Sequence, residues 1–239
     1  NCDHCIGILG LLQTMNLQNR TESVEIFGPD GIDEFIAANI KSLNFGLSFP
    51  VLISIVNEGL IVDEKDYSVF ANDANHGIPA FSFRFDEKDR PGEFFPENAK
   101  ALEIPEGKLW RELQMGNSIE IDGKEIFSSQ VTGKRRPGRK IGVSGDTRPT
   151  DELVEFFKNC DYLSFDSTFA DELKDKAVEA NHSTAKEAAE LAEKANVSTL
   201  ILTHFSARYN DESVLLEEAK KIHDNTIAAK DLLEVNILK

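Results

Sequence analysis

The sequence predicts an α/β protein, and three observations support this fold class. Between 50 and 85, short alternating runs predict strands that pair with their neighbours in the chain. A strand at 141–144, a helix at 151–158 and a strand at 162–165 then follow in alternation. Finally, the segment 181–209 combines a polar turn, an amphipathic helix and the apolar strand TLILT. Regular alternation of this kind favours a layered sheet covered by helices.

The first third of the chain predicts two helices and several short strands. Helices are expected at 5–15, which is apolar with two glycines, and at 32–43, which is amphipathic. A strand is expected at 23–27. From 50 to 70 the runs VLISIV, GLIV and YSVF, separated by polar turns, indicate an antiparallel meander, and a further strand follows at 80–85.

The segment 181–209 organises the C-terminal half. Its alanines recur at helical spacing, so one face of the helix is small enough to approach a sheet closely: Ala185, Ala188, Ala189, Ala192 and Ala195. The TLILT strand is β-branched and apolar, which predicts burial on both faces. A helix at 213–223 and an edge strand at 233–238 are expected to complete the fold.

The composition is strongly acidic. Asp and Glu total 42 against 26 Lys and Arg, for a formal net charge of −16 in 239 residues. This balance excludes general affinity for nucleic acid, so a polyanionic partner would have to meet a local basic patch or metal ions. Such a patch exists at Lys134, Arg135, Arg136, Arg139 and Lys140, which either contact phosphates or form a solvated loop.

The cysteines and the hydropathy indicate a cytoplasmic protein. Cys2, Cys5 and Cys160 are too few and too unevenly spaced for a disulfide scaffold. A zinc ribbon needs two CxxC pairs, so Cys2 and Cys5 are interpreted as two incidental thiols. No apolar run is long enough to cross a membrane and no signal peptide opens the chain.

The segment 86–123 differs from its surroundings. It is charged, contains Pro and Gly, and holds Trp110, the only tryptophan. We expect one domain over 1–239 from which 86–123 departs as an arm or a long loop.

Histidines indicate where the chemistry lies. Of the five in the chain, His4, His76, His182 and His204 are expected at strand ends or turns, whereas His223 is expected to be solvated on the polar side of a helix. Asp3 beside His4, and Asp146 after a predicted strand, add hard oxygen donors. Imidazole and carboxylate together suit Zn²⁺ or Mn²⁺ in a hydrolase.

The order of several motifs resembles tRNase Z (ribonuclease Z), the tRNA 3′-processing endonuclease family of the metallo-β-lactamase superfamily. Seven segments, spread over nearly the whole chain, support the resemblance: DHCIGILGLLQTM at 3–15, HGIPAFSFRF at 76–85, KDRPGEF at 88–94, IPEGKLWRELQMG at 104–116, RPGRKIGVSGDTRP at 136–149, NHSTAKEAAELA at 181–192 and LTHFSARY at 202–209. The resemblance implies a metallo-β-lactamase-type αββα sandwich, and it makes 86–123 a substrate-binding arm.

The resemblance also implies a mechanism. Two zinc ions would share Asp146; the second would also take Asp3, His4 and His204, and the first would take His76. Two ions neutralise charge that develops on a phosphodiester. Asp3 would orient or deprotonate the attacking water, and His182, supported by Asp166, would protonate the departing 3′-oxygen. The implied partners are precursor tRNA, met by the basic run, and a second subunit in a homodimer.

Two departures from the family pattern qualify this expectation. Aligned on Asp3 and His4, the second histidine of the HxHxDH motif falls on Asn1, and the first would precede the chain. The opening strands of the family also have no counterpart here. We therefore expect a chain truncated at its N-terminus, with an incomplete first zinc site and impaired activity as it stands. In the arm, Glu103 and Lys108 also stand where the family commonly has Gly and Pro.

Two alternatives remain from the sequence. One is a non-catalytic or fragmentary family member that binds RNA or a partner subunit, which metal analysis would distinguish. The other is a different metallo-β-lactamase-fold phosphodiesterase, against which the IPEGKLWRELQMG segment argues.

Overall fold

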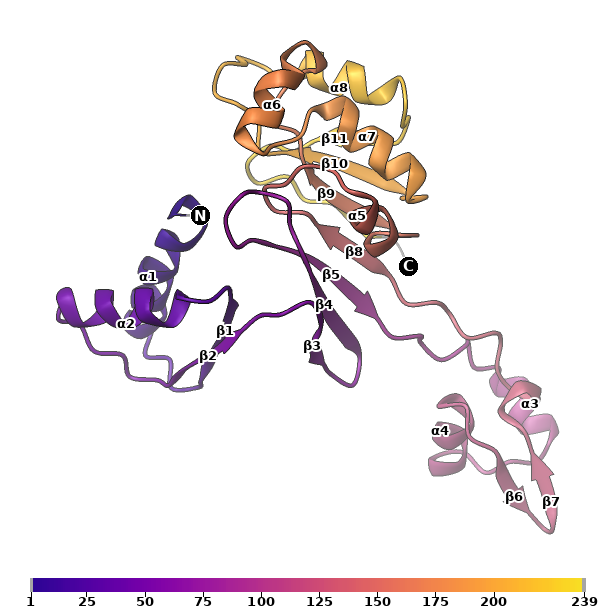
Figure 1. Cartoon of the computed structure of the whole chain (residues 1–239). Coiled ribbons are helices and arrows are strands. Elements are labelled where there is room, and N and C mark those ends of the chain that lie inside the picture. The colour runs from indigo at the N-terminus through magenta and orange to yellow at the C-terminus, as the bar shows by residue number, and fades with distance from the viewer. Residues whose placement is uncertain (1, 238–239) are drawn as a thin grey trace. The chain divides into compact units, whose positions relative to one another are not determined.

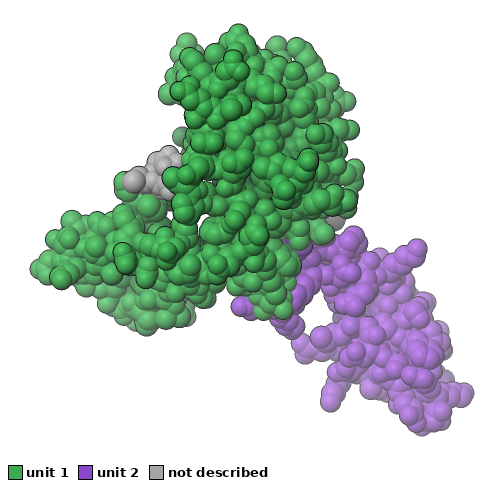
Figure 2. All heavy atoms as spheres, viewed as in Figure 1, with its two compact units in different colours: residues 1–63, 68–85, 140–239 green, residues 64–67, 86–139 purple. Residues whose placement is uncertain are grey.

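The computed structural model describes residues 2–237, with side chains from His4 onward. It divides into two compact units, coloured separately in Figure 2. Unit 1 comprises Asn1–Asp63, Ser68–Phe85 and Lys140–Lys239, and unit 2 comprises Glu64–Tyr67 and Asp86–Arg139. The segment 86–123 lies inside unit 2, which continues to Arg139.

The described residues form one large mixed sheet with the strand order β11-β10-β9-β8-β5-β4-β3 (Figure 1). Strands β8 to β11 pair in parallel, whereas β3 and β4 pair antiparallel. The predicted α/β class is therefore confirmed. In chain order the strands are β3 Gly59–Asp63, β4 Tyr67–Asp73, β5 Phe81–Glu87, β8 Lys140–Val143, β9 Tyr162–Asp166, β10 Thr199–Thr203 and β11 Thr226–Ala228.

Helices α5 Asp151–Phe156, α6 Lys174–Ala180, α7 Ala185–Lys194 and α8 Ser213–Lys220 accompany the parallel strands. The five predicted alanines of α7 and its C-cap are fully buried in the main core, as their helical spacing predicted. Small side chains let α7 approach β9 and β10, whose Leu163, Phe165, Leu200 and Leu202 are also fully buried. The TLILT strand alternates in burial, so the prediction that both its faces are buried is wrong.

The N-terminal part of unit 1 differs from the predicted meander. Strand β2 (Val51–Ile55) pairs in parallel with β1 (Val24–Gly28) in a separate two-stranded sheet, and only β3, β4 and β5 join the large sheet. Alternation identifies a strand but not its partner. Helices α1 (Cys2–Leu17) and α2 (Ile32–Ser42) pack on β1 and β2 around a core of Leu12, Ile32, Ile36 and Phe49.

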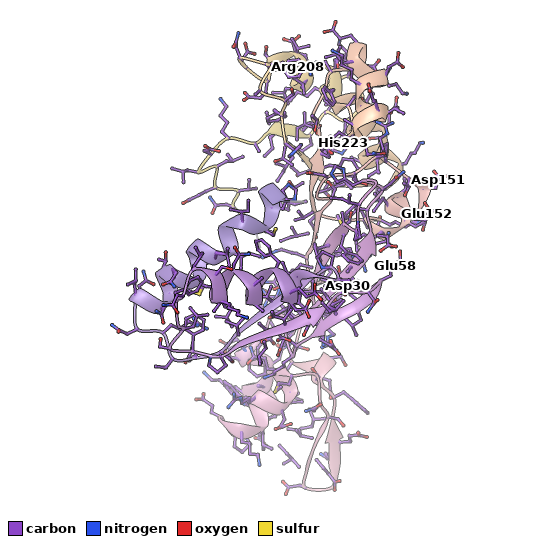
Figure 3. All side chains as sticks on the ribbon, turned by 60° about the vertical axis from the view of Figure 1, so that its left-hand side comes forward. Asp30, Glu58, Asp151, Glu152, Arg208 and His223 are labelled. Atoms are coloured by element: carbon purple, nitrogen blue, oxygen red, sulfur yellow. The ribbon has the colours of Figure 1, made fainter. Side chains whose placement is uncertain are left out.

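Two predictions at the C-terminus are also wrong. Residues 233–237 form no strand in the described part of the chain, and the sheet edge is β11 instead. His223, labelled in Figure 3, is 6% exposed rather than solvated. The helix α8 ends at Lys220, so His223 lies beyond it, and its Nε2 lies 2.9 Å from the carbonyl oxygen of Val197.

Unit 2 has a core of its own. Helices α3 (Pro96–Ala101) and α4 (Lys108–Gln114), the hairpin of β6 (Ile119–Ile121) and β7 (Lys124–Ile126) and the 3₁₀ turn at Ser128–Gln130 enclose a buried cluster of Ala99, Ile104, Leu113, Ile119, Ile126 and Val131. The Trp110 indole packs on this cluster and donates to the Ile104 carbonyl oxygen at 2.9 Å. Glu103 has a φ of +55°, a conformation that glycine adopts without strain.

Candidate active site

Asp146 is the residue on which three imidazoles converge. It follows β8 and Gly145, whose φ of +61° turns the chain at the strand end, and its side chain is only 4% exposed. His4 Nε2 lies 3.4 Å from Asp146 Oδ2, and His76 Nε2 lies 3.7 Å from the same oxygen. His204 Nε2 lies 3.5 Å from Asp146 Oδ1. The structure thus brings together donors from four distant parts of the sequence.

These separations suit ligands of a shared cation. Ligands bound about 2.0–2.1 Å from one ion in a tetrahedral arrangement lie roughly 3.3 Å apart. Among the described side chains, ligand atoms of Asp146, Asp166, His182 and His204 also lie within 4.8 Å of one another. Asp and His residues therefore form a group that could hold a metal ion.

The outer ring nitrogens of two of these histidines have fixed partners. His76 Nδ1 lies 3.0 Å from the carbonyl oxygen of Asn181, and His204 Nδ1 lies 2.8 Å from Thr168 Oγ1. Such bonds orient an imidazole so that its other nitrogen points at a metal. His204 directly follows β10 with a φ of +62°, an uncommon conformation for a non-glycine residue and one typical of functional sites.

His182 and Asp166 form a second arrangement beside the first. His182 Nδ1 lies 2.7 Å from Oδ2 of Asp166, which is fully buried at the end of β9. The two carboxylate oxygens of Asp166 also accept hydrogen bonds from the backbone of Thr147 and from the backbone and hydroxyl of Thr168. Because these four bonds occupy the carboxylate, we assign Asp166 to the orientation of His182 rather than to metal binding. The rings of His182 and His204 stack at 4.8 Å.

Arg148 and Glu187 form a largely buried ion pair next to the loop of His182. Both terminal nitrogens of Arg148 donate to Glu187, at 2.7 and 2.5 Å. Burial raises the pKa of the Glu187 carboxyl, but the hydrogen bond from Arg148, the backbone N–H of Thr184 and the charges of Arg148 and Lys174 outweigh it, so the net pKa lies below the ordinary value. Glu187 is therefore ionised near neutral pH.

The structure describes the other predicted site residues to different extents. His4 lies in the first turn of α1 and not at a turn or strand end, which corrects that expectation. Asp3 belongs to the same helix, but its side chain lies outside the described residues, as does Asn1. In the basic run, Lys134, Arg135 and Arg136 are exposed, whereas Arg139 and Lys140 are half-buried. Arg136 pairs through its backbone with Arg90.

Sequence reasoning missed several residues of the site. Thr168 contacts His204, Arg148 contacts the carbonyl oxygen of His182, and Glu187 accepts the backbone N–H of Thr184 in the loop after His182. Thr184 and Glu187 form a capping box at the start of α7, and their Ser/Thr-x-x-Glu spacing is visible in the sequence. The partners of Thr168 and Arg148 could not be found this way, because they lie on other elements.

Comparison with known proteins agrees with this geometry. A model of the beta-lactamase superfamily domain matches residues 105–205. A ribonuclease Z of Nitrosopumilus maritimus is 61% identical over 235 residues, which are 98% of this chain and 79% of that protein. The chain belongs to the ribonuclease Z family. A ribonuclease Z of Methanosarcina acetivorans is 41% identical over 99% of this chain and 78% of its own length.

Solved structures show the same fold. Human tRNase Z, short form, superposes with a TM-score of 0.66 and 24% identity over 98% of this chain and 74% of that one. A metallo-beta-lactamase fold protein of Bacillus subtilis superposes with a TM-score of 0.62 and 16% identity over 96% and 71% of the two chains. Both confirm that the metallo-β-lactamase fold predicted by the resemblance is correct.

Proposed function

We propose that this chain is a zinc-dependent endoribonuclease that removes the 3′ trailer from precursor tRNA by hydrolysis and leaves a 3′-hydroxyl on the tRNA. One observation supports this most directly. Three imidazoles converge on the Asp146 carboxylate beside the His182–Asp166 pair, in a chain that is 61% identical to a ribonuclease Z. Imidazole and carboxylate donors favour divalent zinc, as the family implies.

The donor set suggests how two ions would be held. We assign His4, His204 and Asp146 to one ion, with Asp3 as a further ligand, and His76 and Asp146 to the other. Bound zinc would supply Lewis-acid polarisation of the phosphodiester and lower the pKa of water. Asp146 can serve both sites because its carboxylate contacts the histidines of both: Oδ2 faces His76 and His4, and Oδ1 faces His204.

The structure supports His182 as the general acid. Its Nδ1 hydrogen is donated to the buried Asp166 carboxylate, which leaves Nε2 to present a proton. The leaving group is the 3′-oxygen of the tRNA, a poor one until protonated, so a positioned acid speeds its departure. Asp166 stabilises the charged ring that donates the proton. As the family resemblance implies, Asp3 would orient or deprotonate the attacking water.

RNA contacts are assigned to unit 2 and the basic run. Unit 2 encloses its own buried cluster, as an independently folded arm requires. The exposed side chains of Lys134, Arg135 and Arg136 would meet phosphates of the tRNA, joined by Arg139 and Lys140. Local contacts of this kind overcome a net charge of −16 because phosphate binding depends on nearby charges and ions.

We further propose a cytoplasmic homodimer. Within the described residues, no helix is both long and apolar enough to cross a membrane. Sedimentation equilibrium of the purified chain tests the assembly, since a monomer at every concentration would contradict it.

The activity is tested with a precursor tRNA that has a short 3′ trailer. Because Asn1 stands where the family has a histidine ligand, we expect slow cleavage to a product ending in a 3′-hydroxyl, loss of that cleavage with a zinc chelator, and recovery when zinc is restored. Asp146→Asn should abolish both cleavage and zinc retention, whereas Asp151→Asn, an exposed carboxylate at the start of α5 (Figure 3), should change neither. Hydrolysis of small phosphodiesters but not precursor tRNA would favour a different phosphodiesterase.

A further inference from the structure

Arg148 and Glu187 form a buried pair that nothing in the proposed chemistry uses directly. Their side chains are 15% and 7% exposed, and the pairing is bidentate: Nη1 donates to Oε2 and Nη2 donates to Oε1. Bidentate pairing fixes the plane of the guanidinium group as well as its position. A buried ion pair is weak evidence for stability, because desolvation offsets its attraction. The location of the pair, beside the loop of His182, says more about its role.

Arg148 contacts the loop of His182. Its Nη1 lies 2.6 Å from the carbonyl oxygen of His182, in addition to its bond to Glu187. A guanidinium group presents five donors in a fixed fork and can therefore serve a carboxylate and a carbonyl at once, which a lysine ammonium at the same place would do with poorer geometry. The main chain of the candidate acid is thus held directly by Arg148.

The same residue joins the other two loops of the site. Arg148 follows Asp146 by two positions, and its backbone N–H donates at 2.9 Å to the carbonyl oxygen of Asn75, which precedes His76. Arg148 therefore contacts or adjoins all three loops that present Asp146, His76 and His182.

Glu187 fixes the other end of this connection. Its Oε2 accepts the backbone N–H of Thr184 at 3.1 Å, which completes the capping box of α7. Ser183 Oγ adds a bond of 2.5 Å to the carbonyl oxygen of Thr147. The His182 loop is consequently bound on both sides, to the start of α7 and to the loop of Asp146.

We propose that the Arg148–Glu187 pair is a positioning pair for His182, which sets the distance between the candidate acid and the leaving oxygen. Neither side chain needs to touch the substrate. This inference rests on the proposed function, because it assigns the pair to proton donation at the same site. A displacement of about 1 Å in a catalytic group can cost on the order of 10²-fold in rate.

The test compares two leaving groups in the full chain. Precursor tRNA has a poor alkoxide leaving group that needs a proton, whereas a p-nitrophenyl phosphodiester has one that departs unprotonated. We expect Arg148→Lys to lower kcat on precursor tRNA by roughly 10²-fold, with KM and zinc content nearly unchanged. Its rate on the p-nitrophenyl diester should stay close to that of the unmodified chain. Glu187→Gln should behave in the same direction.

Lys186→Gln is the matched control. It removes a charge from the same helix by breaking a half-buried ion pair with Asp171, in which Lys186 Nζ lies 2.8 Å from Asp171 Oδ2. Both rates should be unchanged in this variant. Equal loss on the two substrates in Arg148→Lys would overturn the inference, because it would indicate general damage to the site.

Hydrogen exchange gives a readout that needs neither activity nor metal. In Arg148→Lys we expect faster exchange of the His182 and Thr184 amides, with the Leu200 and Leu202 amides of β10 unchanged. Unchanged exchange at His182 and Thr184, or faster exchange throughout, would overturn the inference. An unmodified chain that fails to cleave precursor tRNA would instead contradict the proposed function, and the exchange result would still decide whether Arg148 holds the loop.

Discussion

His182 Nδ1 and Asp166 Oδ2 lie 2.7 Å apart, with the Asp166 carboxylate fully buried at the end of β9. The pair joins an imidazole on one loop to a carboxylate at the end of a parallel strand, where open sheets place ligands and chemistry. The contact with Asp166 fixes the tautomer and the orientation of the His182 ring.

Asp166→Asn tests this relationship. The amide keeps the size of the side chain but cannot stabilise a charged His182 ring, so kcat on precursor tRNA should fall by about 10²- to 10⁴-fold. KM should change little, because the tRNA is held elsewhere. Single-turnover cleavage rates measure the effect. Asp175→Asn, an exposed carboxylate on α6, is the control and should cleave normally. A normal rate in Asp166→Asn would contradict the assigned role.

Thr168→Val tests the outer contacts of the metal site. The hydroxyl of Thr168 lies 2.8 Å from His204 Nδ1 and donates to Asp166 Oδ1 at 2.7 Å. Its removal should lower zinc affinity or activity by roughly 10- to 100-fold, because His204 loses its orienting partner. Competition with a chromophoric chelator measures the affinity. Thr226→Val removes a buried hydroxyl beside His223 instead, and should retain zinc. Equal affinities in the two variants would be inconsistent with a role for Thr168.

Glu187→Gln should make stability depend less on pH. The folded pKa of Glu187 is lowered, so its contribution to stability is present above the unfolded value of 4.5 and is lost as the pH falls through the folded pKa. At pH 7 the free energy of unfolding should be about 2 kcal/mol lower in the variant than in the unmodified chain. That difference should shrink below pH 4.5.

Urea unfolding of the chelated proteins at several pH values provides the measurement for Glu187. Chelation removes the separate effect of metal loss in acid. A difference that grows as the pH falls would show that the ionised carboxylate destabilises the fold, contrary to the prediction.

The double substitution Lys134→Ala and Arg135→Ala tests the basic run. Both side chains are exposed, so their loss should leave the fold intact. Affinity for precursor tRNA should fall, and the slope of log affinity against log salt should become shallower by roughly 0.7–0.9 for each phosphate contact removed. Fluorescence anisotropy at several salt concentrations measures both. Lys220→Ala with Lys221→Ala removes the same charge at the end of α8. An identical slope in the two double variants would favour the solvated-loop interpretation.

Sequence patterns predicted most of the elements because local spacing determines them. The alanines of α7 recur at helical intervals, and the structure buries all five. Which strand pairs with which could not be predicted from local patterns. Strand β2 alternates like a member of a meander, yet it pairs in parallel with β1, since alternation is the same for either partner. The prediction that His223 is solvated was also wrong. It assumed that the helix continues to residue 223, whereas α8 ends at Lys220 and His223 is buried.

The sequence by itself indicated the family and most of the helices and strands, because these follow from motif order and from local spacing; its assignment of residues to zinc and proton transfer stays a prediction. Only the tertiary structure decided that His4 lies in a helix, that Thr168 orients His204, and that Arg148 connects the His182 loop to Glu187. Each of these contacts joins side chains that lie on different elements. Their distances depend on how the sheet and its loops pack, and no local spacing in the chain records that packing.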